Sequence, residues 1–170
     1  GNRIDFHADL DWREIGGPEV GTPGASISLG TARQVWAECP FGVVERLPAA
    51  RDFPTLRFVA TNEYTVLTSG KGGFNWDGER WQMRVIRSSY NPDPLPEVNR
   101  QTFSWSMVVH GERPSDANLV RMGLEHNHPL LVCADSWHEG ALPATHSGLT
   151  VAGEDVVISS VGPGQLTVTN

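Results

Sequence analysis

Histidines and carboxylates are the residues of this chain whose types and spacing come closest to a metal-binding or catalytic pattern. His126 and His128 have the His-x-His spacing that, on a strand, aims two imidazoles at one metal ion. Here the pair falls at the end of a predicted helix, directly before Pro129. A helix C-terminus favours histidine through the helix dipole, so we prefer this structural explanation to a metal site.

A second group of such residues lies near the start of the chain. His7, Asp9 and Asp11 alternate with apolar residues and could form a small acidic site on one face of a strand. A solvated sheet face accounts for the same pattern, and we favour it. The chain has neither the Gly-x-Ser-x-Gly turn of hydrolases nor a phosphate-binding loop. We therefore expect no catalytic residue and no metal ligand in it.

Composition limits the class of protein further. The chain has 170 residues, the length of one domain, and is 39% hydrophobic and 19% charged, so enough apolar surface exists to offset the entropy lost on ordering. No apolar run approaches the roughly 20 residues of a membrane span. The formal net charge of −7 argues against nucleic acid as a partner. Cys39 and Cys133 lack disulfide-framework or metal spacing. They could form a disulfide in an oxidising compartment, but we favour two free, buried thiols in a cytoplasmic protein.

The elements that must position any site are mostly short strands. Residues 3–12 and 102–110 alternate between polar and apolar types, which predicts two half-buried antiparallel strands. Shorter strand-like stretches occur at 26–29, 34–38, 42–46, 56–61, 64–67, 81–86, 130–133, 149–151, 156–161 and 166–168. With turn residues between them, these stretches predict an all-β sandwich or barrel.

One helix and a shared core complete this prediction. Ser115 is an expected N-cap, and Leu119, Met122 and His126 follow at helical spacing before Pro129 ends the helix. Asp77 and Gly78 suit a hairpin turn. The residues expected to be buried on facing sheets are Phe6, Leu10, Trp12, Val85, Phe103, Trp105 and Met107.

Six tryptophans raise the question of sugar binding, because aromatic faces stack on sugar rings. Trp12, Trp81 and Trp105 are in phase with the apolar faces of their strands, so we assign them to the core. Trp76 and Trp137 lie near turns and are the candidates for exposed stacking platforms.

Several segments, taken in order, resemble the C-terminal β-sandwich region of bacterial glycoside hydrolase family 38 α-mannosidases. The segments that carry this resemblance span nearly the whole chain and are RIDF through DWRE (3–14), PFGVVER (40–46), YTVL (64–67), KGGF (71–74), VIRSS with NPDP (85–94), FSWSM (103–107) and NHPLLV (127–132). The chain departs from the family pattern at Ser89, where proline is usual, and in the residues before Phe103, where an Asp-x-Gly-x-His pattern is missing.

The resemblance implies a fold and a context for the chain. The fold would be an antiparallel β-sandwich of the galactose-mutarotase-like, or supersandwich, kind with one or two short helices. Residues 1–170 would form a single C-terminal domain excised from a larger retaining α-mannosidase, a cytoplasmic, bacterial enzyme. In that family, the catalytic residues and most ligands of a divalent metal, usually zinc, lie in an N-terminal domain. This chain alone would then be inactive and hold no cofactor.

By position in the matched motif, Arg87 with Asp93 becomes the candidate for the rim of the substrate cleft. A guanidinium offers a planar set of donors to sugar hydroxyls and carboxylates. The alternative is a structural Arg87 that pairs with Asp93 or Glu97 on the sheet edge. For the whole chain, the alternatives to a domain that packs on a catalytic partner are an independent carbohydrate-binding module and a purely structural assembly domain.

Overall fold

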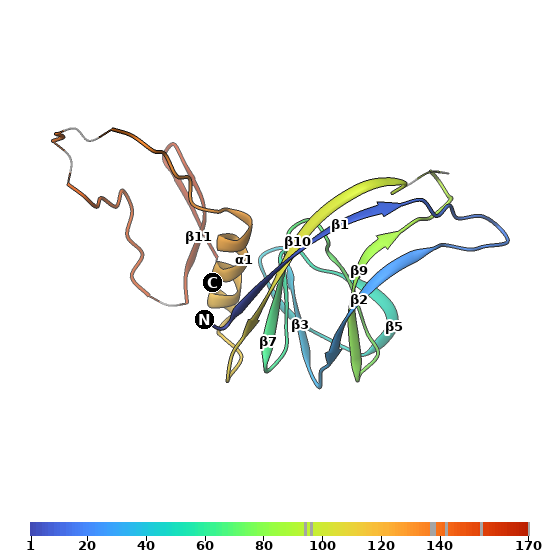
Figure 1. Ribbon diagram of the computed structural model, residues 1–170. Helices are drawn as coiled ribbons and strands as arrows, with labels where there is room; N and C mark the ends of the chain where they lie inside the picture. The colour runs from blue at the N-terminus through green and yellow to red at the C-terminus, as the bar shows by residue number, and fades with distance from the viewer. Residues whose placement is uncertain (94, 96, 137–138, 142, 154, 170) are drawn as a thin grey trace.

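A computed structural model describes residues 1–93, 95, 97–136, 139–141, 143–153 and 155–169 (Figure 1). The first strands are β1 (Arg3–Trp12), β2 (Gly24–Thr31), β3 (Val35–Cys39), β4 (Gly42–Arg46), β5 (Ala49–Pro54) and β6 (Phe58–Ala60). They are followed by β7 (Tyr64–Thr68), β8 (Gly73–Trp76), β9 (Arg80–Arg87) and β10 (Asn99–Val109). The helix α1 (Asp116–Asn127) and the hairpin of β11 (Val157–Gly162) and β12 (Gln165–Thr169) complete the described chain.

Two antiparallel sheets form a sandwich, as the alternation predicts. The larger sheet has the strand order β1-β10-β7-β6-β3-β4, and the smaller has the order β2-β9-β8-β5. The two long amphipathic strands, β1 and β10, pair along their whole length, with Phe6 opposite Trp105. The all-β prediction with a short helix is therefore confirmed.

The main core lies between the two sheets. Side chains of the larger sheet at every second position, such as Val59 and Val66, meet Phe74, Trp81 and Met83 of the smaller sheet. Of the seven residues predicted for this core, Val85, Phe103 and Trp105 are buried, and Phe6, Leu10, Trp12 and Met107 are half-buried and packed against it. The prediction is confirmed because each strand directs alternate side chains to one face.

The opposite face of the larger sheet carries the helix. Phe58 and Leu67, one position out of phase with the main-core residues, pack against Leu119 of α1 and Val157 of β11. Figure 1 shows α1 between the sandwich and the β11–β12 hairpin. The Ser115 hydroxyl accepts a hydrogen bond from the Asn118 amide, so the predicted N-cap is confirmed.

Other predicted elements differ from the structure. Residues 130–133 and 149–151 form no strand, and Leu130, Leu131 and Val132 are 93%, 101% and 92% exposed. Strand β5 was not predicted, because Ala49–Pro54 shows no alternation and its pairing with β8 contains an irregularity. Cys39 and Cys133 are free thiols, but Cys39 is half-buried and Cys133 is exposed, so the prediction that both are buried is wrong. Within the described residues, no helix is long and apolar enough to cross a membrane.

Candidate functional site

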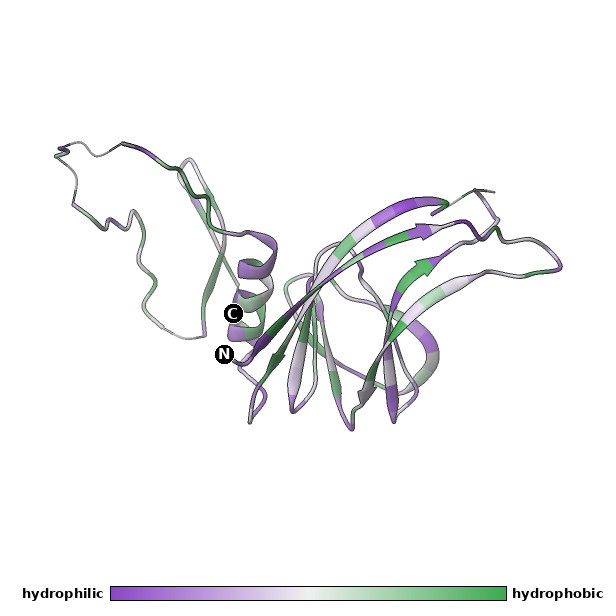
Figure 2. Cartoon of the chain, in the orientation of Figure 1, coloured by the Kyte–Doolittle hydropathy of each residue, from purple (hydrophilic) through white to green (hydrophobic). Residues whose placement is uncertain are grey.

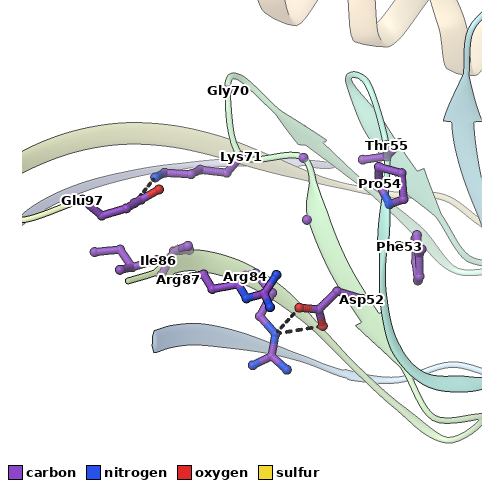
Figure 3. Close-up of a pocket in the computed structure, with 13 residues that line it drawn as sticks. Asp52, Phe53, Pro54, Thr55, Gly70, Lys71, Arg84, Ile86, Arg87 and Glu97 are labelled. Carbon is purple, nitrogen blue, oxygen red and sulfur yellow. Dashed lines mark hydrogen bonds and ion pairs between the residues drawn. The ribbon is translucent and has the colours of Figure 1, made fainter. Parts of the chain in front are cut away.

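Two neighbouring hollows lie at the end of β9. The first hollow, of about 510 Å³, lies between β5, the turn before β8 and Glu97. The second hollow, of about 560 Å³, is bounded by Thr22, Gly24, Arg51 and Asn75. Both hollows share the residues Asp52, Arg84, Ile86 and Arg87. The end of β9 therefore contributes to both hollows. Figure 3 shows the residues that line the first one.

A β-bulge places Arg84 and Arg87 on the same face of the smaller sheet. In a regular strand, residues three apart point to opposite faces. Opposite β2, however, Ser26 pairs with Arg84 and Ala25 with Ile86, so Val85 is the extra residue of a bulge. The alternation restarts after Val85, so Ile86 stays in the core while Arg87 is exposed. Figure 3 shows the two arginines close together on β9.

The two arginines differ in how they are held. Arg84 Nε donates to both carboxylate oxygens of Asp52, at 3.0 and 3.2 Å, and its Nη1 donates to the Ser26 hydroxyl at 2.8 Å. Among the described residues, the Arg87 guanidinium makes no hydrogen bond or ion pair. Arg84 is thus a fixed wall of the site, and Arg87 presents unused donors.

The backbone beside Arg87 is firmly anchored. The next residue, Ser88, is buried; its amide donates to the Pro23 carbonyl at 2.8 Å, and its hydroxyl donates to the Glu14 carbonyl at 3.1 Å. Across the pair, a Cβ on Gly24 would lie 2.8 Å from the Ile86 carbonyl oxygen, so only glycine lets β2 approach β9 here. The backbone position of Arg87 is therefore fixed by the contacts of its neighbours and does not depend on contacts of the Arg87 side chain.

The far wall of the first hollow is also fixed by polar contacts. Lys71 Nζ donates to Gln101 Oε1 at 3.0 Å and lies 3.7 Å from Glu97 Oε2. Gln101 in turn donates to the Glu97 carbonyl at 2.8 Å. These bonds hold Glu97 in the left-handed backbone region, with φ of 63°. Lys71 and Glu97 therefore neutralise each other and leave the charge of the site to the arginines.

The structure separates the site residues that the sequence analysis grouped together. Asp93 lies outside both hollows, and its carboxylate accepts the Leu95 amide in a turn. The alternative reading of Arg87 as a partner of Asp93 or Glu97 is not what the structure shows, because Glu97 pairs with Lys71. Of the two candidates, only Arg87 lines these two hollows.

The tryptophan prediction is wrong for Trp76. Its side chain is only 4% exposed and its Nε1 donates to the Ala32 carbonyl at 3.1 Å, so neither ring face is available to a sugar. The signal was present in the sequence: Trp76 is in phase with Phe74, and both point into the core. Trp137 lies outside the described residues.

The acidic face near the chain start is a paired surface. Asp9 forms an ion pair with Arg100 of the neighbouring strand, and Asp11 pairs with Arg13 at 2.8 Å. The hydrogen bonds from Arg100 lower the pKa of Asp9, so this carboxylate is poorly suited to hold a proton for catalysis. Within the part of the chain that the structure describes, no three His, Cys, Asp or Glu side chains gather as metal ligands would.

Sequence reasoning missed Arg51, Asp52 and Arg84 as parts of the site. One signal could have indicated the bulge: Val85 and Ile86 are adjacent apolar residues that interrupt the alternation of β9. The placement of Arg51 depends on a second irregularity, where β5 has two more residues than β8 between paired positions. No pattern in the sequence of β5 marks that irregularity.

Comparison with known families and curated proteins identifies no relative of this chain. No protein-family model matches the chain, and no curated protein matches it.

Proposed function

We propose that this chain is the non-catalytic C-terminal β-sandwich domain of a cytoplasmic, bacterial α-mannosidase of glycoside hydrolase family 38. In this proposal it packs on a metal-dependent catalytic domain and presents Arg87 at the rim of the substrate cleft. The ordered resemblance of its segments to that family motivates the assignment. The antiparallel sandwich is consistent with it.

The observation that carries the proposal is the state of Arg87. Its backbone is fixed by Ser88 and by the close approach of Gly24, yet its guanidinium has no partner among the described residues. A rigid backbone with free charged donors is what a residue needs in order to bind a group that another domain or a substrate supplies. Arg87 also lines both hollows, where such a group has room.

The segment after α1 supports the packing part of the proposal. Leu130, Leu131 and Val132 form a contiguous apolar run that touches almost nothing in the described chain. Contiguous exposed apolar residues of this kind mark interaction surfaces. Figure 2 shows this hydrophobic stretch leaving the helix on the side away from the sandwich. A neighbouring domain would bury it.

The alternative of a carbohydrate-binding module gains no support from the tryptophans. Trp76, Trp81 and Trp105 are buried, while Trp12 and Trp36 are half-buried. The Trp36 ring is further covered by the Arg113 guanidinium, which lies 4.6 Å from the ring centroid. The described part of the chain therefore offers no row of exposed tryptophan rings for stacking on sugars.

The test is made on the full-length protein, with an aryl α-mannoside as the substrate. Arg87→Ala should lower kcat/KM by a factor equivalent to about 1–3 kcal/mol, as for a lost charged hydrogen bond. Arg33→Ala, which removes an exposed arginine outside both hollows, is the matched control and should leave kcat/KM unchanged. Unchanged kinetics in Arg87→Ala with reduced stability would favour a structural domain and contradict the proposal.

A further inference from the structure

We propose that the second hollow, lined by Arg51, Arg84 and Arg87, is a binding site for a small oxyanion, namely a phosphate or carboxylate group carried by a small molecule. This inference does not rest on the mannosidase proposal. It follows from the charge, the partners and the shape of the hollow, and it can be tested on the 170-residue chain alone.

The hollow has an excess of positive charge. Three arginines and one carboxylate, Asp52, line it, and that carboxylate is already occupied by Arg84 Nε. Among the described residues, the side chains of Arg51 and Arg87 have no hydrogen-bond or ion-pair partner. Two uncompensated guanidinium groups therefore face one cavity, in a protein whose formal net charge is −7. Electrostatics favours an anion here over a neutral or cationic ligand.

Two independent irregularities create this concentration of arginines. The bulge at Val85 turns Arg87 onto the face that already carries Arg84. The irregularity between Ala49 and Asp52 occurs on the edge strand across the sheet, next to Arg51. Bulges commonly redirect side chains next to functional sites. If either strand lacked its irregularity, regular alternation would turn its arginine, Arg87 or Arg51, to the opposite face of the sheet from the other two.

The shape of the hollow favours a small ligand over a flat protein contact. A volume of about 560 Å³ lies within the range of small-molecule sites, roughly 300–1,000 Å³. Ser26 and Asp52 hold the Arg84 guanidinium in place. Its Nη2 has no hydrogen-bond partner among the described residues, and the rigid guanidinium plane fixes the direction in which this donor points. Arg51 and Arg87 add donors that match the geometry of phosphate or carboxylate oxygens. Asn75 and Thr22 supply neutral polar groups at the margin.

The experiment is a titration of the purified chain at constant ionic strength, in which binding is measured by calorimetry and by changes in amide chemical shifts. The probes are inorganic phosphate, glucuronate, neutral mannose and an acidic Glu-rich peptide, with chloride as the background anion. Phosphate or glucuronate should bind, with shifts concentrated at β9 and β5, and mannose should not. The stronger of the two oxyanions identifies whether the group is phosphoryl or carboxylate.

The variant Arg51→Gln/Arg87→Gln should weaken oxyanion binding at least about tenfold, because each arginine contributes charge-assisted hydrogen bonds. Both residues are exposed and unpartnered, so folding should not suffer. Arg33→Gln/Arg80→Gln removes the same charge from exposed positions outside both hollows and should change the affinity less than twofold. Equal losses in the two double variants would overturn the proposal. So would binding of the acidic peptide alone, which indicates a protein partner, or binding of no oxyanion above chloride.

Discussion

At the residue scale, half of the twelve arginines in this chain lie against a carboxylate. Six arginines form such ion pairs, and they are Arg3, Arg13, Arg57, Arg84, Arg100 and Arg113. With a single lysine in the chain, the twelve arginines supply nearly all the positive charge that balances the acidic surface. Arg51 and Arg87 form no ion pair among the described residues, and both line the same cavity. Arg33 and Arg80 also form no ion pair there, but neither lines this cavity. The convergence of two unpaired guanidinium groups on one hollow is what distinguishes a candidate site from a solvated surface.

Trp105 allows a residue-scale test of the core. Its ring is 9% exposed and stacks on Phe6, with ring centroids 4.9 Å apart, and on Phe103 at 5.7 Å. Trp105→Ala removes these contacts and leaves a cavity between the sheets. We expect it to lower the free energy of unfolding by about 3–5 kcal/mol, measured by urea denaturation.

A matched control for this measurement lies on the paired strand. Ile4 is 55% exposed, so Ile4→Ala loses little buried surface and should cost much less than Trp105→Ala. A loss below about 1 kcal/mol for Trp105→Ala would contradict the stacked arrangement, because truncation of a packed Trp removes far more surface than that.

At the element scale, sequence predicts strands better than it predicts their irregularities. Strict alternation identifies β1 and β10, because each buries one face only. The edge strand β5 shows no alternation, and the bulge in β9 is visible only as the adjacent pair Val85 and Ile86. The candidate site depends on these irregular places, so sequence reasoning reached Arg87 only through a resemblance and missed Arg51 and Arg84.

Residues 130–133 show the opposite kind of error. The apolar run Leu130, Leu131 and Val132 has the composition of a strand, but a strand also needs a neighbour to accept its backbone hydrogen bonds. No such neighbour pairs with it in the described chain. Local composition therefore predicts the tendency of this segment to form a strand, but whether a strand forms depends on a neighbouring strand that can pair with it.

The docking of α1 on the sheet predicts a pH dependence. His126 is half-buried near the end of α1, and its Nδ1 lies 3.2 Å from both Arg3 Nη2 and the Ser106 hydroxyl. Burial, and secondarily the Arg3 charge, lower the pKa of His126, while Asp5 opposes this shift. Burial also lowers the pKa of His110. Both histidines therefore favour the neutral form in the folded state.

The sign of the effect follows from these directions. Below the ordinary histidine pKa of about 6.5, the unfolded chain binds protons that the folded chain resists, so stability falls as the pH decreases from about 7 to 5. Urea denaturation across this range should show a slope of at most about 1.4 kcal/mol per pH unit for each histidine. His126→Gln should reduce the slope, and His110→Gln/His126→Gln should reduce it further. An identical slope in the wild type and both variants would contradict the proposed docking role of His126.

At the scale of the whole molecule, sequence predicts the class of fold but not the pairing of distant strands. The alternation of β1 says which side chains are buried, whereas its partner β10 lies almost a hundred residues away. The closure of the larger sheet by β10, between β1 and β7, decides which polar groups meet. The ion pair of Asp9 with Arg100 is one result, and it converts a candidate acidic site into a paired surface.

Because the carboxylates of this strand face are paired with arginines, we expect that this chain, taken alone, will not hydrolyse α-mannosides, with or without added zinc. A retaining glycosidase requires two carboxyl groups about 5 Å apart, one a nucleophile and one an acid with a raised pKa. Asp9 and Asp11 share a strand face, but both are exposed and paired with arginine, and the pKa of Asp9 is lowered rather than raised. An open sheet surface also cannot exclude water from a sugar.

An assay of the purified chain on an aryl α-mannoside should therefore give no more turnover than the buffer blank, and the same result is expected for the double variant Asp9→Asn/Asp11→Asn. Turnover by the chain that disappears in this double variant would make the acidic strand face an active site in its own right.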